Sequence, residues 1–99
     1  LPVLRWISLA KGAKAPPSKP DGGTFEVTFL NRGKQKAQLF WMDREGKPKP
    51  YALIEPGGVK IQRTRPGAVW MIAEAEKGKR EPLGYFKVGD RRARAIVPE

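Results

Sequence analysis

Residues 25–42 read FEVTFLNRGKQKAQLFWM, and this stretch decides the fold class. Its first residues alternate in character, which places Phe25, Val27 and Phe29 on one face of an extended strand. The segment NRGKQK then forms a turn, and AQLFWMD forms a second strand. The stretch therefore predicts two successive β-strands that bury at least one face.

The same alternation of short strands and turns continues to the end of the chain. Further strands are expected at residues 47–51, 59–64, 68–75, 83–88 and 92–97. Pro48 and Pro50 cannot donate ladder hydrogen bonds, so residues 47–51 are expected at a sheet edge. No segment has sustained helical periodicity. The sequence thus predicts an all-β fold, an antiparallel β-sandwich of about seven short strands with no substantial helix.

Both faces of the AQLFWMD strand are apolar, so one face belongs to the core and the other to a covered or functional surface. If Phe40 and Met42 point into the core, Trp41 points out of it. The same reasoning, with Val69 in the core, turns Trp70 outward. Two outward tryptophans would be a costly exposure unless a ligand covers them. The pattern therefore predicts an aromatic binding surface.

The 99 residues are enough for one domain. Residues 1–24 are expected to contain a short strand at about 3–9, followed by a tether rich in Pro, Gly and Lys. Residues 25–99 are expected to form the main β-domain. We predict that the two parts make one folded unit.

The chain contains no cysteine and no histidine, which excludes disulfides, thiolate nucleophiles, histidine acid–base chemistry and ordinary zinc sites. Ser8 and Ser18 have no histidine partner. Asp43 and Glu45 flank a turn, where carboxylates commonly serve as turn formers. The sequence predicts a protein that is not an enzyme and needs no metal or cofactor. It contains no signal or membrane-spanning segment, so its localisation is unknown, and we expect it to be part of a longer or secreted protein.

The net charge is +10, from 20 Lys and Arg against 10 Asp and Glu. Such an excess fits a well-solvated surface, and it equally fits an anionic partner. Arg32, Lys34 and Lys36 alternate, as do Arg92 and Arg94, which on a strand would form a cationic stripe.

A set of residues spread over the chain has the spacing of a known family: FLNR at 29–32, Trp41, GKPKPY at 46–51, Pro56, Gly57, Thr64, Gly67 and Trp70. In this spacing the chain resembles the β-domain family of the von Hippel–Lindau (VHL) tumour suppressor, from about Phe25 to Pro98. The combination of a tryptophan with the following G-x-P-x-P-Y is the most specific part of the resemblance. It implies a seven-stranded antiparallel β-sandwich, the known member of which binds a hydroxyproline-bearing peptide as an added strand.

The resemblance also implies roles for individual residues. Trp41 and Trp70 would form the walls of a ring-binding pocket, and the phenol of Tyr51 would hydrogen-bond the ligand backbone. Thr64 stands where the family has a serine whose hydroxyl meets the hydroxyproline. Arg63 and Arg65 flank it, and their backbone would pair with the added strand.

The chain departs from the family in three respects. Ala68 stands where the family has the histidine that makes the second hydrogen bond to hydroxyproline, so selectivity over plain proline should be weaker. The helical domain that recruits a ubiquitin-ligase scaffold has no counterpart, so no such partner is implied. The family's last β-domain strand is also missing, and we expect residues 3–9 to supply it. This version looks like a stand-alone or appended, bacterial domain.

We therefore expect a non-enzymatic peptide-binding module for an extended segment containing proline or hydroxyproline, which the charge suggests is acidic. The expected ligand-binding residues are Trp41, Tyr51, Arg63, Thr64 and Trp70. One alternative is a basic domain that binds an anionic polymer, either nucleic acid (the less favoured partner) or envelope polysaccharide. Another is a structural accessory domain whose pocket has decayed.

Overall fold

The computed structural model describes residues 1–75 and 81–99, and these residues form strands but no helix. The strands are β1 (Ile7–Ser8), β2 (Phe25–Asn31), β3 (Ala37–Met42), β4 (Pro48–Ile54), β5 (Val59–Thr64), β6 (Val69–Glu74), β7 (Pro82–Lys87) and β8 (Ala93–Val97). The predicted all-β fold is thereby confirmed. The charged turn expected between β6 and β7 falls mainly on residues 76–80, outside the described residues.

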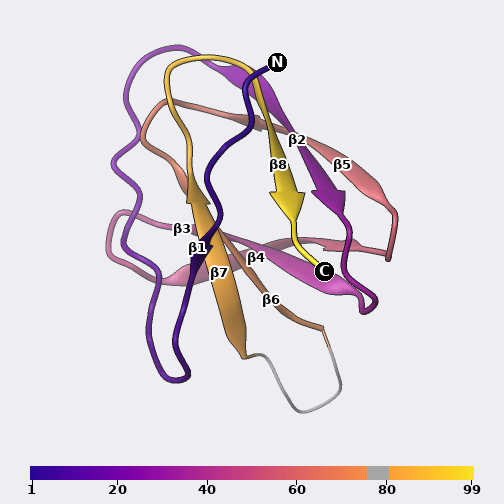
Figure 1. The fold of residues 1–99 in the computed structure, drawn as a ribbon. Coiled ribbons are helices and arrows are strands. Elements are labelled where there is room, and N and C mark those ends of the chain that lie inside the picture. Colours follow the sequence, from indigo (N-terminus) through magenta and orange to yellow (C-terminus); the bar gives the residue numbers. More distant parts are fainter. Residues whose placement is uncertain (76–80) are drawn as a thin grey trace.

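The strands form two sheets that pack face to face (Figure 1). The larger sheet has the order β1-β7-β6-β3-β4, and the smaller has the order β5-β2-β8. All pairings between named strands are antiparallel except that of β2 with β8, which is parallel. The predicted antiparallel sandwich is therefore confirmed, with one parallel pair. Pro48 and Pro50 lie in β4, an edge strand as expected.

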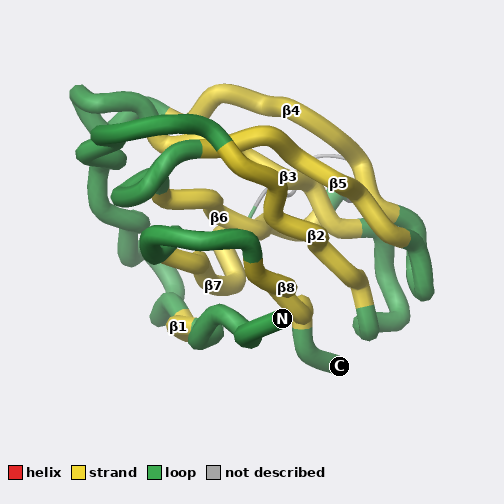
Figure 2. Tube along the Cα trace, turned by 90° about the horizontal axis from the view of Figure 1, so that it is seen from above, coloured by secondary structure: helices red, strands yellow, loops and turns green. Residues whose placement is uncertain are grey.

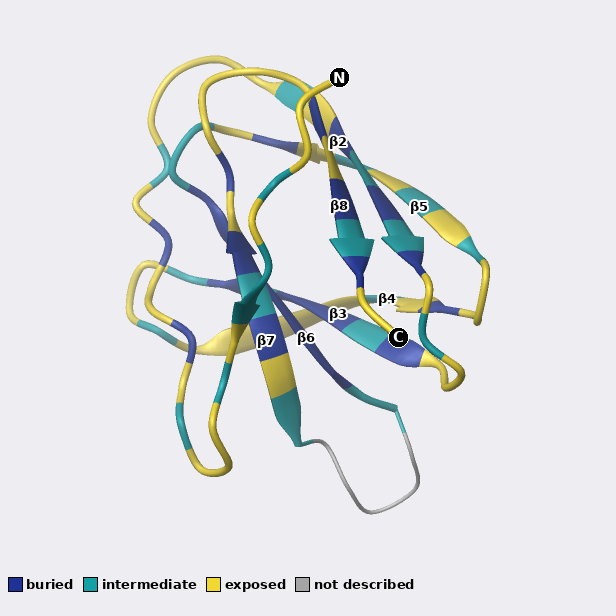
Figure 3. Ribbon diagram, viewed as in Figure 1, coloured by how far each residue is buried: buried dark blue, intermediate teal, exposed yellow. Residues whose placement is uncertain are grey.

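The core lies between the sheets and contains the residues that the alternation of β2 predicted. Val27 and Phe29 are completely buried. The ring of Phe29 lies edge-on to those of Trp70 and Phe86, with centroids 5.9 and 6.0 Å away. Figure 3 shows the buried residues along the inner strands, whereas β4 and β5 are largely exposed. Aromatic packing across the sheets thus joins β2, β6 and β7.

The expected outward orientation of Trp41 and Trp70 is wrong. Trp70 is 2% exposed and faces the core between the sheets, on the same side as Leu39 and Ile72, and Trp41 packs against the margin of the same core. The opposite face, with Phe40 and Met42, forms a second apolar cluster outside the sandwich. Both faces of β3 and β6 are apolar, and alternation along a strand cannot tell which of two apolar faces meets the other sheet. The sequence-based assignment of the inner and outer faces of these strands is therefore reversed in the structure.

The second cluster is covered by part of the tether, residues 15–22, which we call the N-terminal strap. Ala15 is buried in this cluster. The strap has no strand or helix, as expected of a Pro-rich segment. It is nevertheless fixed, because the hydroxyl of buried Ser18 accepts a hydrogen bond from the amide of Val69 (2.7 Å) and donates to its carbonyl (3.4 Å).

Residues 2–9, the N-terminal segment, connect the two sheets at one side of the sandwich. The amide of Leu4 donates to the carbonyl of Arg94 in β8 (2.8 Å), and the amide of Leu9 donates to the carbonyl of Leu83 in β7 (3.0 Å). The N-terminal segment therefore lies against the edges of both sheets, β8 in one and β7 in the other (Figure 2).

At the opposite side, β4 and β5 each pair with only one neighbour in the part of the chain that the structure describes. The sandwich is thus closed on the side of the N-terminal segment and open between β4 and β5. Free strand edges are places where another extended chain can add hydrogen bonds.

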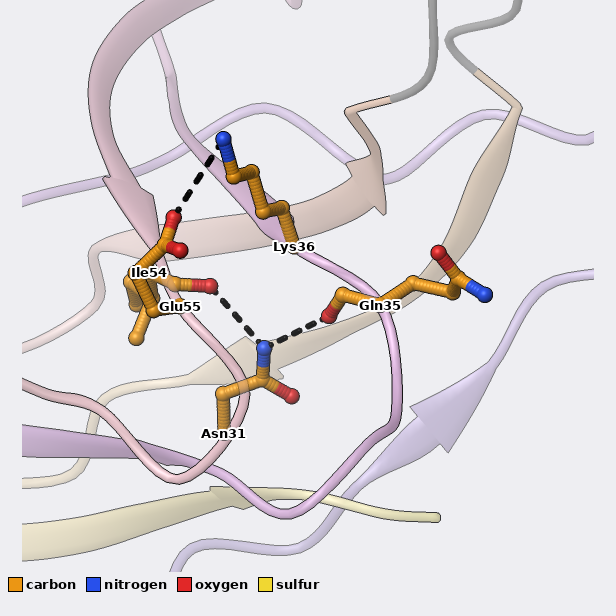
Figure 4. A network of polar contacts seen from close by, with 5 residues as sticks. All are labelled: Asn31, Gln35, Lys36, Ile54 and Glu55. Atoms are coloured by element: carbon orange, nitrogen blue, oxygen red, sulfur yellow. Dashed lines mark hydrogen bonds and ion pairs between the residues drawn. The ribbon is translucent and has the colours of Figure 1, made fainter.

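The end of β2 is tied to the end of β4 by Asn31, the third residue of FLNR. Its side-chain amide donates to the carbonyls of Gln35 and Ile54, both at 2.9 Å (Figure 4). Its side-chain oxygen accepts from the amide of Gly33 (2.8 Å). Asn31 is almost completely buried and fully used in these contacts, so its role is structural.

Arg32, Lys34 and Lys36 lie in the loop between β2 and β3, where the sequence predicted a turn, so the strand that a cationic stripe would require is not present there. The ammonium of Lys36 lies 3.6 Å from the carboxylate of Glu55 (Figure 4). Side chains in a loop do not alternate between two faces, so the spacing of these cations does not produce a continuous surface.

Candidate binding pocket

A pocket of about 320 Å³ lies at the open side of the sandwich. It is lined by Pro20, Trp41, Arg44, Tyr51, Arg63, Thr64, Arg65, Ala68 and Trp70. All five residues that the sequence suggested for ligand binding are among them, although they come from four different strands. A larger cavity of about 390 Å³ lies beside Trp6 and residues 33–37, and none of these five residues lines it.

Two tryptophans from neighbouring strands form the aromatic part of the pocket. Trp41 in β3 and Trp70 in β6 are directly opposite each other in the antiparallel register. Trp70 is buried, whereas Trp41 is half-buried at the margin of the core. The ring of Tyr51 stands perpendicular to that of Trp70, at 89° with centroids 5.0 Å apart. Tyr51 is 53% exposed, so its phenol is available to a ligand.

Tyr51 reaches this position through a β-bulge in β4. Leu39 is opposite Ala52, but its neighbour Phe40 is opposite Pro50, so Tyr51 has no partner of its own in β3. A bulge adds one residue to a strand and changes the direction of the side chain at that point. The bulge therefore removes Tyr51 from the regular alternation of β4 and accounts for its position beside Trp70.

Thr64 supplies a hydroxyl group inside the pocket. Its side chain is 6% exposed, and its Oγ1 accepts a hydrogen bond from the indole Nε1–H of Trp70 (2.9 Å). A hydroxyl has one donor hydrogen and two acceptor lone pairs, so its O–H and one lone pair remain for a ligand. Ala68, which also lines the pocket, supplies a methyl group. Thr64 thus places a hydroxyl with unused hydrogen-bonding capacity in the pocket.

Three guanidinium groups surround the pocket: those of Arg44, Arg63 and Arg65. Within residues 1–75 and 81–99, none of the three forms an ion pair, and no carboxylate lines the pocket. Cations gathered around one concave surface create a positive potential there.

Sequence reasoning missed two of the lining residues, Pro20 and Arg44. Pro20 belongs to the strap, and Arg44 lies in the turn between β3 and β4. Neither position has a local pattern that points to a site. Pro20 joins the pocket because long-range hydrogen bonds place the strap there, and these were not visible in the sequence.

Asp43 and Glu45 behave as turn residues. The carboxylate Oδ1 of Asp43 accepts hydrogen bonds from the amides of Glu45 and Lys47, both at 2.8 Å. The pKa of Asp43 lies below its ordinary value, mainly because the amide of Lys47 donates a hydrogen bond to the ionised carboxylate. Desolvation raises the pKa by a smaller amount. The amide of Glu45 and the positive charges of Lys49 and Lys47 lower it further. A carboxylate held ionised in this way stabilises the turn that leads into β4.

Among the described residues, no three metal-ligating side chains gather at one place. In the same residues there is no helix with the length and apolar character needed to cross a membrane.

Comparison with known proteins relates this chain to one family. The family model described as the VHL beta domain matches residues 20–84. A comparison with curated proteins finds no match. The VHL β domain is a substrate-recognition domain that binds proteins or peptides, and it is a binding rather than a catalytic domain. The matched residues include every residue that lines the 320 Å³ pocket.

Proposed function

Because this chain belongs to the VHL β-domain family, we propose that it is a peptide-binding module, without catalytic activity, for an extended segment that contains proline or hydroxyproline. The observation that supports this most directly is the pocket between β4 and β5. Trp41, Tyr51 and Trp70 surround it, and the hydroxyl of Thr64 lies within it. Proline-rich segments commonly bind in grooves lined by aromatic side chains. They are already extended before binding, so they lose little conformational entropy when they bind.

In this proposal the ligand ring enters the pocket while its backbone runs along a free sheet edge. The phenol of Tyr51 donates to a carbonyl of the ligand. If the ligand ring is hydroxyproline, its hydroxyl forms a hydrogen bond with the hydroxyl of Thr64. Since Ala68 offers no second polar partner, discrimination between hydroxyproline and proline rests on a single side-chain hydroxyl and is weak.

The charge around the pocket suggests the composition of the ligand. Arg44, Arg63 and Arg65 form no ion pair among the described residues, although Glu26 lies opposite Arg63 in the register of β2 and β5. Asp or Glu residues on either side of the ring would pair with these guanidinium groups. We therefore propose an acidic peptide, for which the positive potential would mainly increase the rate of association.

The proposal is tested by calorimetric titration with two peptides that are identical except for one residue, proline or 4-hydroxyproline, flanked by Asp and Glu. We expect Trp41→Ala to weaken binding of both by at least about tenfold, because aromatic anchors in a pocket carry much of the binding energy. Trp41 is half-buried, so the variant should keep its cooperative thermal unfolding. Binding that survives Trp41→Ala unchanged would rule out this pocket.

Thr64 allows a matched pair of variants. Thr64→Val removes the hydroxyl at nearly constant shape, and Thr64→Ser keeps it. We expect Thr64→Val to weaken the hydroxyproline peptide about fivefold, the value of one hydrogen bond, while Thr64→Ser restores it. Equal behaviour of the two variants toward both peptides would show that the hydroxyl has no part in binding.

The alternatives predict different results. Binding to an anionic polymer would weaken steeply with salt and would depend little on Trp41. A decayed pocket would bind neither peptide. Aromatic-dependent binding with a modest salt effect is the result expected for the peptide module.

A further inference from the structure

The N-terminal strap contributes a side of the pocket from a distant part of the sequence. Pro20 lines the pocket together with Trp41 and Trp70. Since the strap was expected to be only a connection, its presence in the pocket needs a physical explanation. The contacts of residues 18–22 supply one.

Backbone hydrogen bonds hold the strap against the loop between β5 and β6. The amide of Lys19 donates to the carbonyl of Gly67, and the amide of Asp21 donates to the carbonyl of Pro66, both at 3.0 Å. The approach is so close that a Cβ atom at Gly67 would collide with the carbonyl oxygen of Lys19. Gly67 also has a positive φ of 84°, which disfavours other residues. The strap is therefore seated on this loop rather than loosely attached.

Two arginines that line the pocket also hold the strap, through side-chain hydrogen bonds to its carbonyl groups. The guanidinium of Arg44 donates to the carbonyl of Pro20 (2.9 Å), and that of Arg65 donates to the carbonyl of Gly22 (2.6 Å). Each guanidinium has five N–H donors, so both can still meet a ligand. With the buried hydroxyl of Ser18 as a third anchor, the ring of Pro20 is held in place on both sides.

We propose that the strap is a built-in wall of the pocket and that Pro20 is a positioning residue, whose ring packs against the apolar side of the ligand's proline or hydroxyproline ring. This inference rests on the proposed function and adds a residue from a distant part of the sequence to that site. Pro20 is a wall rather than an occupant, because about 320 Å³ remains beside it. Pro20 and Ala68 both present apolar groups, so the methylene groups of the bound ring lie against them while a ring hydroxyl lies toward Thr64.

The test compares Pro20→Gly with Pro17→Gly in the titrations with the matched proline and 4-hydroxyproline peptides. Pro17 belongs to the same strap but is exposed and does not line the pocket. Both changes loosen the unfolded chain to a similar extent, so their effects on stability should be similar. We expect Pro20→Gly to weaken the binding of both peptides about tenfold, because both rings lose the same apolar contacts with the wall. Pro17→Gly should leave both affinities within about twofold.

Two results would overturn the inference: unchanged affinities for both peptides in Pro20→Gly, or a gain in both affinities, which would mean that the strap competes with the ligand. Pro20→Ala, which changes the backbone less, serves as the second variant if Pro20→Gly unfolds. Failure of the proposed function looks different, since the wild-type protein would then bind neither peptide or would bind both without Trp41.

Discussion

Trp70 belongs to the core and to the pocket at the same time. Its ring packs edge-on against Phe29 inside the sandwich and against Tyr51 at the open side. Its indole N–H is bonded to Thr64, which fixes the hydroxyl that a ligand would meet. Because one side chain makes all these contacts, the geometry of the pocket is coupled to the packing of the core.

We expect Trp70→Ala to lower the free energy of unfolding by about 3–5 kcal/mol, the range for removing a buried aromatic ring. Urea unfolding measures the loss. Trp41→Ala is the matched control and should cost less, since Trp41 is half-buried. Equal losses in the two variants would contradict the burial of Trp70.

At the scale of the element, the hairpin of β3 and β4 positions Tyr51. Asp43 holds the turn through two amide hydrogen bonds, and its carboxylate lies 3.9 Å from the ammonium of Lys49. The bulge opposite Leu39 and Phe40 then brings Tyr51 to the pocket. The turn and the bulge together determine where Tyr51 lies beside the pocket.

The turn should give the protein an acid-dependent stability. The folded state lowers the pKa of Asp43 below its ordinary value of 3.8. The ionised carboxylate therefore contributes stability above that value, and this contribution is lost as pH falls through the folded pKa. We expect Asp43→Ala to melt at a lower temperature than the wild type at pH 7, with a difference that shrinks toward pH 2.

Thermal unfolding followed by circular dichroism between pH 7 and pH 2 measures this difference. Comparing the two proteins at each pH removes the effect of the other carboxylates. A difference in melting temperature that stays constant over the whole range would mean that Asp43 acts without its charge.

At the scale of the whole molecule, the sandwich is closed on one side and open on the other. The N-terminal segment bonds to both β7 and β8, and Trp6 lies against Phe86 with ring centroids 5.2 Å apart. The ring of Trp6 also occupies the space that a side chain at position 84 would take. The segment thus covers the core where β7 and β8 end the two sheets.

Deletion of residues 1–12 should therefore destabilise the domain severely. We expect a loss of about 3 kcal/mol, from the contacts of half-buried Trp6 together with the backbone hydrogen bonds to β7 and β8. A loss of this size lowers the melting temperature of a small domain by more than about 10 °C. Differential scanning calorimetry of the truncated and full chains tests this, and equal melting curves would rule out a structural role for the N-terminal segment.

The sequence predicted the strands and turns well because they depend on local chemistry. The alternation in β2 identified Val27 and Phe29 as core residues, and Pro48 and Pro50 identified β4 as an edge. In β3 and β6 the same reasoning failed, since both faces of these strands are apolar. The reversed orientation of Trp70 followed from that ambiguity.

The sequence by itself determined the fold class, the edge strand and the set of aromatic and hydroxyl side chains that characterise the family. Periodicity, proline and spacing are local properties, and a linear chain displays them directly. Only the tertiary structure decided which face of β3 and β6 meets the other sheet and that Pro20 and Arg44 belong to the pocket. These features depend on hydrogen bonds between distant residues, such as Ser18 with Val69 and Arg44 with Pro20, which form only when the chain is folded.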